Sequence, residues 1–224
     1  MRAWIALLEL PPWICGCGDW ALAIKKTLHA AEQNRPDVAK KRKHWHEQFP
    51  RKKINALVFV DECGANTKMT RWRGRSLIGQ RLFSHVPHGH YHTNTLIGAI
   101  RKKGALAPCV FDGAMNGELF LTWVKQELVK RLRKNDVVIF DNLRAHKVAG
   151  AREAIESVGA QVLLLPPYSP DFNPIENMWS KIKQRLRSLA PRTLEALLSA
   201  YGRAFNEVTS SDCKGFFSHA GYDT

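Results

Sequence analysis

Short apolar runs bounded by turn residues dominate the chain directly after residue 54 and predict β-strands. Such runs occupy residues 55–61, 79–86 and 93–100, and runs of this length between turn residues are typical of strands. Successive strands without an intervening helix usually pair as antiparallel neighbours. We therefore expect these three segments to form a meander of three strands.

The pattern then changes to helices alternating with strands. Residues 116–132 predict a helix, because Asn116 is a suitable N-cap and apolar residues recur at helical spacing behind it. Two apolar runs at residues 136–141 and 161–165 flank a helical pattern at 148–158. A strand–helix–strand order predicts two parallel strands joined by a crossover, and their continuous apolar character indicates that both are buried.

A proline-punctuated loop leads into a basic, amphipathic helix. Asn173 is a suitable N-cap for this helix, and Pro174 fits its first position. The apolar residues that recur at helical spacing are Ile175, Met178, Trp179, Ile182 and Leu186. Such a stripe predicts docking against the sheet and leaves the basic side outward for a polyanion. The basic residues of the helix are Lys181, Lys183, Arg185 and Arg187.

The chain before residue 54 differs from the rest. Residues 1–23 have neither helical nor strand periodicity, whereas residues 24–53 are polar, charged and helical in pattern. We therefore expect residues 1–53 to form an N-terminal arm or linker. Residues 54–224 are expected to form one α/β domain, in which a five-stranded mixed sheet is flanked by helices.

The charge of the chain points to a polyanionic partner. Its 224 residues include 34 Lys and Arg against 20 Asp and Glu, a formal net charge of +14, and such an excess favours nucleic acid. One basic cluster surrounds Trp72 and contains Arg71, Arg73 and Arg75. We expect these arginines to bind the DNA backbone, with a solvated loop as the equal alternative.

The cysteine pattern and the hydropathy of the chain indicate in which cellular compartment the protein is found. The five cysteines are an odd number at scattered positions, which indicates neither a disulfide framework nor a zinc site. No apolar stretch is long enough to cross a membrane, and the N-terminus lacks a clean cleavage signal. We expect an intracellular protein with reduced thiols and no membrane partner.

Three carboxylates stand at the ends of expected elements. Asp61 closes the first strand, Asp141 closes the fourth, and Glu176 begins the basic helix. Parallel neighbouring strands bring their ends together at one edge of a sheet, where α/β proteins bind ligands. Carboxylate oxygens are the ligands that Mg²⁺ prefers, and such a trio suits two-metal phosphodiester chemistry. The pattern therefore indicates a metal site.

Each acid taken alone also has a purely structural explanation. Glu176 stands three residues after Asn173, as in a capping box. Asp141 and Asn142 can begin an Asx turn, and Asp61–Glu62 can be an exposed pair. The joint pattern of three acids favours the metal site over these separate explanations.

Three segments carry a resemblance to a known family. They are Asp61-Glu-Cys-Gly, Asp141-Asn followed by His146-Lys147, and Leu165-Pro-Pro-Tyr-Ser-Pro-Asp-Phe-Asn-Pro-Ile-Glu-Asn-Met-Trp. Together they resemble the acidic-triad (DDE) transposases of the mariner superfamily, in its bacterial insertion-sequence branch. The 34 residues between Asp141 and Glu176 agree with the spacing in that branch. The resemblance runs from about residue 25 to residue 222.

The resemblance implies an RNase H-like fold and a DNA transposase catalytic domain. It implies that Asp61, Asp141 and Glu176 hold two Mg²⁺ ions, with Mn²⁺ as a substitute, for phosphodiester cleavage at transposon ends and strand transfer into target DNA. Asn142 and His146 are expected to support the metal ligands or to contact DNA, and packing of His146 against the following helix is an equal alternative.

The resemblance also implies partners and a location. Double-stranded DNA of the transposon ends and of the target is the expected substrate, bound by a homodimer. The expected location is the prokaryotic cytoplasm, in association with the nucleoid. The expected DNA contacts are the basic residues of the amphipathic helix that begins at Pro174 and those of the cluster around Trp72.

The N-terminal segment departs from the family. Relatives carry helix-turn-helix domains ahead of the catalytic core, and residues 1–23 resemble none. We expect these residues to be foreign to the family and the chain to be a truncated or frameshift-expressed second half, which can be inactive. Two alternatives stay open: a non-catalytic DNA-binding remnant that regulates an intact transposase, and a stand-alone RNase H-like nuclease.

Overall fold

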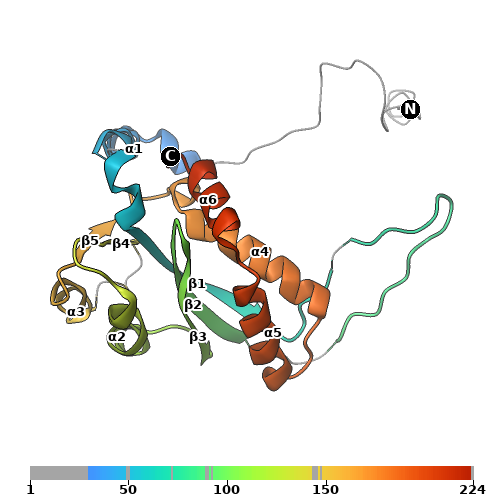
Figure 1. Ribbon diagram of the computed structural model, residues 1–224. Coiled ribbons are helices and arrows are strands. Elements are labelled where there is room, and N and C mark those ends of the chain that lie inside the picture. The colour runs from blue at the N-terminus through green and yellow to red at the C-terminus, as the bar shows by residue number, and fades with distance from the viewer. Residues whose placement is uncertain are drawn as a thin grey trace, which may run out of the picture. The chain divides into compact units, whose positions relative to one another are not determined.

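The computed structural model describes the chain from Ala30 to Tyr222 with short gaps. The described residues are 30–48, 51–71, 73–88, 91, 93–142, 146 and 148–222. The chain from Ala31 onward forms one compact unit, whose elements are labelled in Figure 1. The expectations for residues 1–23 lie outside the described residues.

Five strands form a mixed sheet within this unit (Figure 1). In order across the sheet they are β3 (Gly104–Asp112), β2 (Thr93–Arg101), β1 (Leu57–Asn66), β4 (Val137–Phe140) and β5 (Gln161–Leu164). The pairs β1–β2 and β2–β3 are antiparallel, and the pairs β1–β4 and β4–β5 are parallel. The expected α/β fold and its parallel crossover are confirmed.

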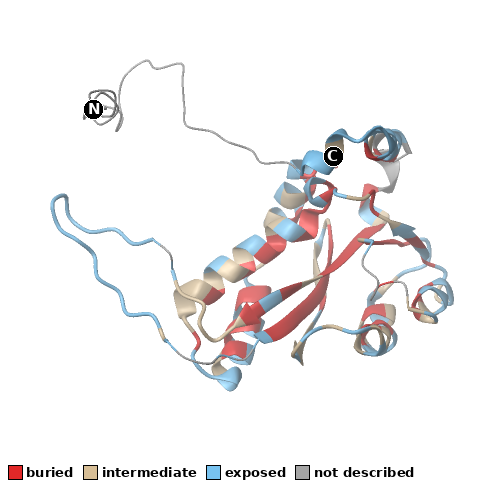
Figure 2. Ribbon diagram, turned by 180° about the vertical axis from the view of Figure 1, so that it is seen from behind, coloured by how far each residue is buried: buried red, intermediate tan, exposed pale blue. Residues whose placement is uncertain are grey.

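The antiparallel meander is present, but one of its strands differs from the expectation. Residues 79–86 form no strand and lie in the long loop between β1 and β2, where every described residue from 73 to 86 is exposed (Figure 2). The third strand is β3, in which Pro108 interrupts the strand pattern of the sequence. Because β3 lies at the edge of the sheet, a proline is tolerated there. An apolar run becomes a strand only where another strand pairs with it.

Helices cover both faces of the sheet (Figure 1). One face carries α4 (Pro174–Leu189), α5 (Leu194–Asn206) and α6 (Ser210–His219), and the other carries α2 (Gly117–Trp123) and α3 (Ala151–Glu156). Successive residues of a strand point to opposite faces, so Phe59 of β1 packs with α4–α6 and Val60 packs with α2 and α3. The sheet therefore separates two hydrophobic cores.

The helix expected at residues 116–132 begins where the sequence indicates but then changes its hydrogen bonding. Asn116 caps α2, because its Oδ1 accepts a hydrogen bond from the backbone N–H of Leu119 at 2.9 Å. α2 continues as a π-helical turn, η4 (Val124–Leu128), and a 3-10 turn, η5 (Val129–Arg131). The apolar side packs against the sheet as expected, but a single regular α-helix is wrong for this segment.

α4 follows the expected pattern except at its N-cap. All five residues of the expected apolar stripe are buried. Asn173 occupies the N-cap position, yet its side chain makes no capping hydrogen bond and no capping box forms with Glu176. The capping-box explanation of Glu176 is therefore wrong, and the helix end does not use its carboxylate.

Part of the expected N-terminal arm packs onto the same core. This part contains η2 (Ala31–Asn34), α1 (Pro36–Gln48) and η3 (Arg51–Ala56). Trp45 of α1 is buried in the core of α4–α6, and its Nε1 donates a hydrogen bond to the hydroxyl of Tyr222 at 3.0 Å. α1 is therefore tied to the C-terminal end of the domain, and the boundary at residue 54 stays a prediction.

Two further observations concern the cysteines and the helices. Cys63, Cys109 and Cys213 carry free thiols, whereas the other two cysteines lie outside the described residues. Within the part of the chain that the structure describes, no helix is long and apolar enough to span a membrane.

Candidate active site

Asp61 lies inside β1 and not at its end. It is the fifth of the ten residues of the strand, so the expectation that it closes the strand is wrong. Strand alternation puts its side chain on the same face as Phe59 and Cys63, which belong to the core under α4–α6. Only 8% of Asp61 is exposed. The first acid is therefore a buried carboxylate on the side of the sheet that α4 covers.

Parallel pairing brings Asp141 next to Asp61. β1 and β4 pair Phe59 with Ile139, and continuing this register by two residues places Asp61 beside Asp141. Asp141 directly follows β4, which ends at Phe140. The second acid therefore lies at the strand end that the sequence indicates.

The third acid reaches the same place from α4. Glu176 lies in the first turn of that helix. Asp61, Asp141 and Glu176 all line one cavity of about 520 Å³. The other residues that line it are Asn142, Leu165–Pro170 and Asn173. The tertiary structure thus brings together the three acids that the sequence singles out.

Desolvation and neighbouring charges raise the pKa values of two of the three acids. Burial and the charges of Glu176 and Glu62 raise the pKa of Asp61 well above its usual range. Burial also raises the pKa of Glu176, a rise that Lys183 opposes and Asp141 increases. Without a bound cation, the cavity therefore disfavours the ionised form of both Asp61 and Glu176. Such an arrangement is typical of a site that binds a cation.

His146 joins one of these acids to a fourth carboxylate. Its Nδ1 lies 2.6 Å from Oδ1 of Asp141, and its Nε2 lies 2.7 Å from Oε2 of Glu62. The imidazole is fully buried and packs against the rings of Phe120 and Phe140. Burial lowers the pKa of this imidazole, but hydrogen bonds to the two carboxylates outweigh burial and raise the pKa to about 9. Both ring nitrogens therefore donate, and His146 is a cation at neutral pH.

Glu62 is a site residue that sequence reasoning missed. As the neighbour of Asp61 in β1, it points to the opposite face of the sheet, where it reaches His146. Its side chain is only 15% exposed, so the explanation of Asp61–Glu62 as an exposed pair is wrong. Strand alternation was the available signal, because two successive residues of a buried strand face two different cores.

Asn142 connects the end of β4 to the proline-rich loop. Its Nδ2 donates a hydrogen bond to the carbonyl oxygen of Leu165 at 2.6 Å. Asn142 also lines the acid cavity, whereas His146 is buried behind Asp141. The structure therefore places both residues beside the second acid, and their functional roles stay predictions.

The basic residues of α4 divide between two sides of the helix. Lys181 and Arg185 form ion pairs with acidic residues of the C-terminal segment, Asp212 and Glu207. Lys183 and Arg187 instead line a second cavity, of about 820 Å³. Residues four positions apart lie in one row on a helix, so each pair forms its own row. Only the row of Lys183 and Arg187 shares its side of the helix with Glu176.

The expected basic cluster around Trp72 lies partly against α4. Arg71 donates a hydrogen bond to Oγ of Ser188, and Arg71 and Arg73 line a cavity together with residues of α4. Arg75 lies farther along the exposed loop and lines none of these three cavities. Trp72 itself lies outside the described residues. The structure therefore brings two of the three arginines to the basic helix.

The donor set of the acid cavity fits a hard divalent cation. Its three acids offer carboxylate oxygens, the ligands that Mg²⁺ and Mn²⁺ prefer. Among the described residues, no three His, Cys, Asp or Glu side chains converge closely enough to hold an ion as they stand. Asp141 also forms a hydrogen bond with His146 at 2.6 Å. The carboxylates that line the cavity are the candidate ligands of such an ion.

One protein family matches most of the sequence between β1 and α5. The family model described as DDE superfamily endonuclease matches residues 56–198, a segment that includes all three acids. No curated protein sequence matches the chain.

Solved structures of Mos1 transposase have a similar fold. The Mos1 paired-end complex with the left transposon end matches with a TM-score of 0.70 at 14% identity, over 88% of this chain and 62% of that chain. The mariner Mos1 paired-end complex with Mg gives 0.69 at 13% identity, over 91% and 66% of the two chains. The catalytic domain of Mos1 mariner transposase gives 0.62 at 13% identity, over 88% and 94%.

These matches define which part of a transposase the chain resembles. The chain spans about 62–66% of the Mos1 chain in the two complexes but covers 94% of the isolated catalytic domain. Its five-stranded mixed sheet flanked by helices is therefore the RNase H-like fold of that domain, as expected from the sequence resemblance.

Proposed function

The chain belongs to the DDE superfamily endonucleases, and from this premise we propose that it is the catalytic domain of a DNA transposase. The proposed reaction is phosphodiester cleavage at transposon ends, followed by strand transfer into target DNA. One observation carries the proposal: Asp61, Asp141 and Glu176 come from three separate elements and line one cavity. A structural role does not require three carboxylates to share a cavity, since like charges placed close together repel one another.

The proposed cofactor is a pair of Mg²⁺ ions, for which Mn²⁺ can substitute, held by Asp61, Asp141 and Glu176. Mos1 complexes with Mg and with Mn are among the similar structures. When bound, such ions activate the attacking oxygen and stabilise the leaving oxygen at phosphorus. The contribution of the chain is a set of three carboxylates around one cavity, of which Asp61 is buried, and a divalent cation would favour their ionised forms.

Neighbouring residues hold the acids in place. His146 orients Asp141 from behind through a hydrogen bond, and Glu62 fixes the other nitrogen of the imidazole. Asn142 keeps the proline-rich loop against the end of β4. In this proposal these three residues act through the acids and the loop, since partners of metal ligands set the orientation of the ligands.

The proposed substrate is double-stranded DNA, namely the transposon ends and the target. The net charge of +14 supports a polyanionic partner, and a Mos1 match is a paired-end complex with a transposon end. The proposed DNA contacts are Arg71, Arg73, Arg75, Lys181, Lys183, Arg185 and Arg187. A homodimer on DNA is part of the proposal.

The origin and organisation of the chain follow the same proposal. We place the chain in the bacterial insertion-sequence branch because of the spacing of Asp141 and Glu176 and the proline-rich motif between them. The proposed location, the prokaryotic cytoplasm in association with the nucleoid, follows from that branch. Residues 54–224 constitute the proposed catalytic domain, and residues 1–53 the arm that precedes it.

The decisive experiment measures Mn²⁺-dependent cleavage of supercoiled plasmid DNA. The parent chain is expected to nick or linearise the plasmid, and Asp61→Asn, Asp141→Asn and Glu176→Gln are each expected to reduce cleavage at least about 100-fold. The amides keep the shape of each side chain but bind Mg²⁺ and Mn²⁺ poorly. Glu195→Gln is the matched control, because Glu195 is likewise an exposed glutamate in the first turn of a helix but lines none of the three cavities.

The outcomes separate the proposal from its alternatives. Cleavage that survives in any of the three acid variants contradicts the proposed site. DNA binding without any metal-dependent cleavage by the parent contradicts catalysis by this chain and supports a binding remnant. Cleavage of branched DNA without strand-transfer products supports a stand-alone nuclease.

A further inference from the structure

The proline-rich loop that lines the acid cavity contains a strained residue. Tyr168 has a φ of +54°, in the left-handed region that a bulky side chain rarely adopts. Glycine or asparagine would occupy this conformation at lower cost. Such strain persists only where surrounding contacts enforce it, and it is often associated with function.

Contacts from the N-terminal helical segment hold this strained backbone. Nε2 of Gln33 donates a hydrogen bond to the carbonyl oxygen of Tyr168 at 2.8 Å. Nη1 of Arg42, in α1, lies 3.4 Å from the same oxygen. Both donors are more than 120 residues away in the sequence, so the conformation of Tyr168 depends on tertiary structure.

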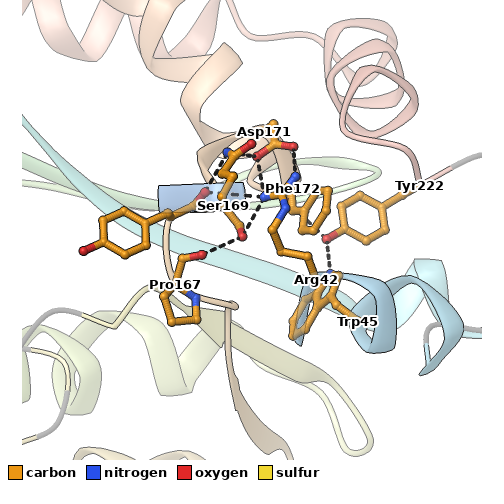
Figure 3. A network of polar contacts seen from close by, with 9 residues as sticks. Arg42, Trp45, Pro167, Ser169, Asp171, Phe172 and Tyr222 are labelled. Atoms are coloured by element: carbon orange, nitrogen blue, oxygen red, sulfur yellow. Dashed lines mark hydrogen bonds and ion pairs between the residues drawn. The ribbon is translucent and has the colours of Figure 1, made fainter. Parts of the chain in front are cut away.

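Arg42 also contacts three further residues of the loop (Figure 3). Its two terminal nitrogens reach the carboxylate of Asp171 at 2.9 and 2.6 Å, and Nη1 also donates to Oγ of Ser169 at 2.8 Å. Its guanidinium stacks 4.0 Å from the ring centre of Phe172. A forked, charge-assisted pair of this kind fixes geometry as well as contributing energy. Arg42 therefore acts as a clamp on the loop.

The clamped turn presents an aromatic ring at the acid cavity. Tyr168 lines that cavity together with the three acids, and 46% of it is exposed. Its hydroxyl has no hydrogen-bond partner among the described residues, so the ring is not held there by a polar contact of its own. An exposed aromatic ring beside a site for a phosphodiester is positioned to meet a nucleobase.

We propose that Tyr168 stacks on an unpaired nucleobase beside the phosphodiester at the acid cavity, and that Arg42 and Gln33 are positioning residues that hold it there. This proposal rests on the proposed function of the cavity, since the phosphodiester is what brings the base to Tyr168. Stacking on an aromatic ring is tolerant of base identity because every base has a π-face. The contact therefore positions DNA without reading its sequence.

The test uses single-stranded oligonucleotides with 2-aminopurine at successive positions, in metal-free buffer so that nothing is cleaved. The parent chain is expected to quench 2-aminopurine at one position. Tyr168→Phe should keep the affinity and the quenching, whereas Tyr168→Ala should weaken binding about 5- to 100-fold and abolish the quenching at that position. Leu198→Ala is the control, since Leu198 is a similarly exposed apolar residue (44%) on α5.

The positioning role has its own measurement. Arg42→Lys keeps the charge but removes the fork, and is expected to lower the quenching several-fold while the far-UV circular dichroism is unchanged. Arg42→Lys should also weaken binding by the parent chain several-fold but should cause no further loss of affinity in the Tyr168→Ala background, because both changes act on one contact. Gln33→Leu should reproduce a smaller part of the effect and serves if Arg42→Lys impairs folding.

The results distinguish this proposal from the proposed function. Equal affinity and quenching in Tyr168→Ala and the parent overturn the stacking proposal, even if the plasmid is cleaved in a metal-dependent way. Quenching that depends on Tyr168 supports stacking, even if no cleavage is found and the proposed function fails. Additive losses in the double variant overturn the positioning role of Arg42.

Discussion

Asp61 and Glu176 carry raised pKa values chiefly because both are at least partly desolvated, and secondly because other carboxylates lie nearby. A carboxyl whose pKa is raised on folding destabilises the folded state when it ionises. At neutral pH without metal, ionisation of these two carboxyls therefore lowers the free energy of unfolding. Functional sites often carry such a cost, and a bound cation removes it.

Neutralising the first acid should stabilise the metal-free protein. Asp61→Asn removes the charge that burial and the neighbouring carboxylates disfavour. We expect its melting temperature in EDTA at pH 7 to exceed that of the parent by about 2–4 °C, corresponding to about 1 kcal/mol in a chain of this size. Addition of Mn²⁺ should raise the melting temperature of the parent more than that of the variant. A lower melting temperature of Asp61→Asn in EDTA would contradict this account.

His146 should make the free energy of unfolding depend on pH, because its protonated form is stabilised in the folded state. Its pKa rises from 6.5 to about 9 on folding, so its contribution is fully present below pH 6.5 and is lost as pH rises through about 9. We expect the free energy of unfolding of the metal-free parent, minus that of His146→Gln, to fall across this window in urea titrations. His219→Gln is the control because His219 is exposed. A difference that stays constant from pH 6.5 to 9 would sink this prediction.

At the level of elements, α4 serves two purposes on different sides. Its apolar stripe packs on the sheet and delivers Glu176 to the cavity. Lys181 and Arg185 are engaged with acids of the C-terminal segment, whereas Lys183 and Arg187 line the neighbouring cavity. The two rows of basic residues should therefore differ in their contribution to DNA binding.

Salt dependence of DNA binding should separate the two rows. Each phosphate contact contributes about 0.9 to the slope of log affinity against log salt concentration. The double variant Lys183→Ala/Arg187→Ala should bind more weakly and lower this slope by about 2. Lys181→Ala/Arg185→Ala removes the same charge but should lower the slope by clearly less, because ion pairs with Asp212 and Glu207 compete with the phosphate contacts of these two residues. Equal changes of slope in both variants would show that the ion pairs of α4 open on DNA.

At the scale of the whole molecule, three distant parts of the chain meet around the proline-rich loop. The hydroxyl of Tyr222 accepts a hydrogen bond from Nε1 of Trp45 and donates one to the carbonyl oxygen of Phe172 at 2.9 Å (Figure 3). These residues belong to α1, the loop and the C-terminal end. The loop that carries Glu176 into place is therefore held from both ends of the described chain.

Removing this hydroxyl should weaken the unit as a whole. Tyr222→Phe removes two buried hydrogen bonds, one from Nε1 of Trp45 and one to the carbonyl oxygen of Phe172, and two such bonds together contribute about 1–3 kcal/mol. We expect a loss of this size in the free energy of unfolding by urea, with circular dichroism and tryptophan fluorescence changing together. Tyr168→Phe is the matched control, because the hydroxyl of Tyr168 has no partner among the described residues. Separate transitions would mean that α1 unfolds independently of the domain.

The sequence by itself determined the elements whose periodicity is local and strong. The parallel strands, the amphipathic helix α4 and the α/β class follow from apolar spacing, N-caps and turn residues. The three acids were also identifiable, because each stands beside a strongly patterned element and the spacing of Asp141 and Glu176 is a property of the chain. The edge strand β3 was not predicted, because Pro108 interrupts its strand pattern. An edge strand also needs fewer apolar residues than a central strand does.

The tertiary structure decided the features that join distant residues. The position of Asp61 within β1 depends on how far β2 extends the ladder, and the link from Glu62 to His146 spans 84 residues. The clamp of Gln33 on Tyr168 spans 135 residues. Such contacts depend on which faces and edges of helices and strands meet on folding. No local sequence pattern specifies these meetings. The sequence therefore indicates which groups are available for chemistry, and packing decides which of them face one another.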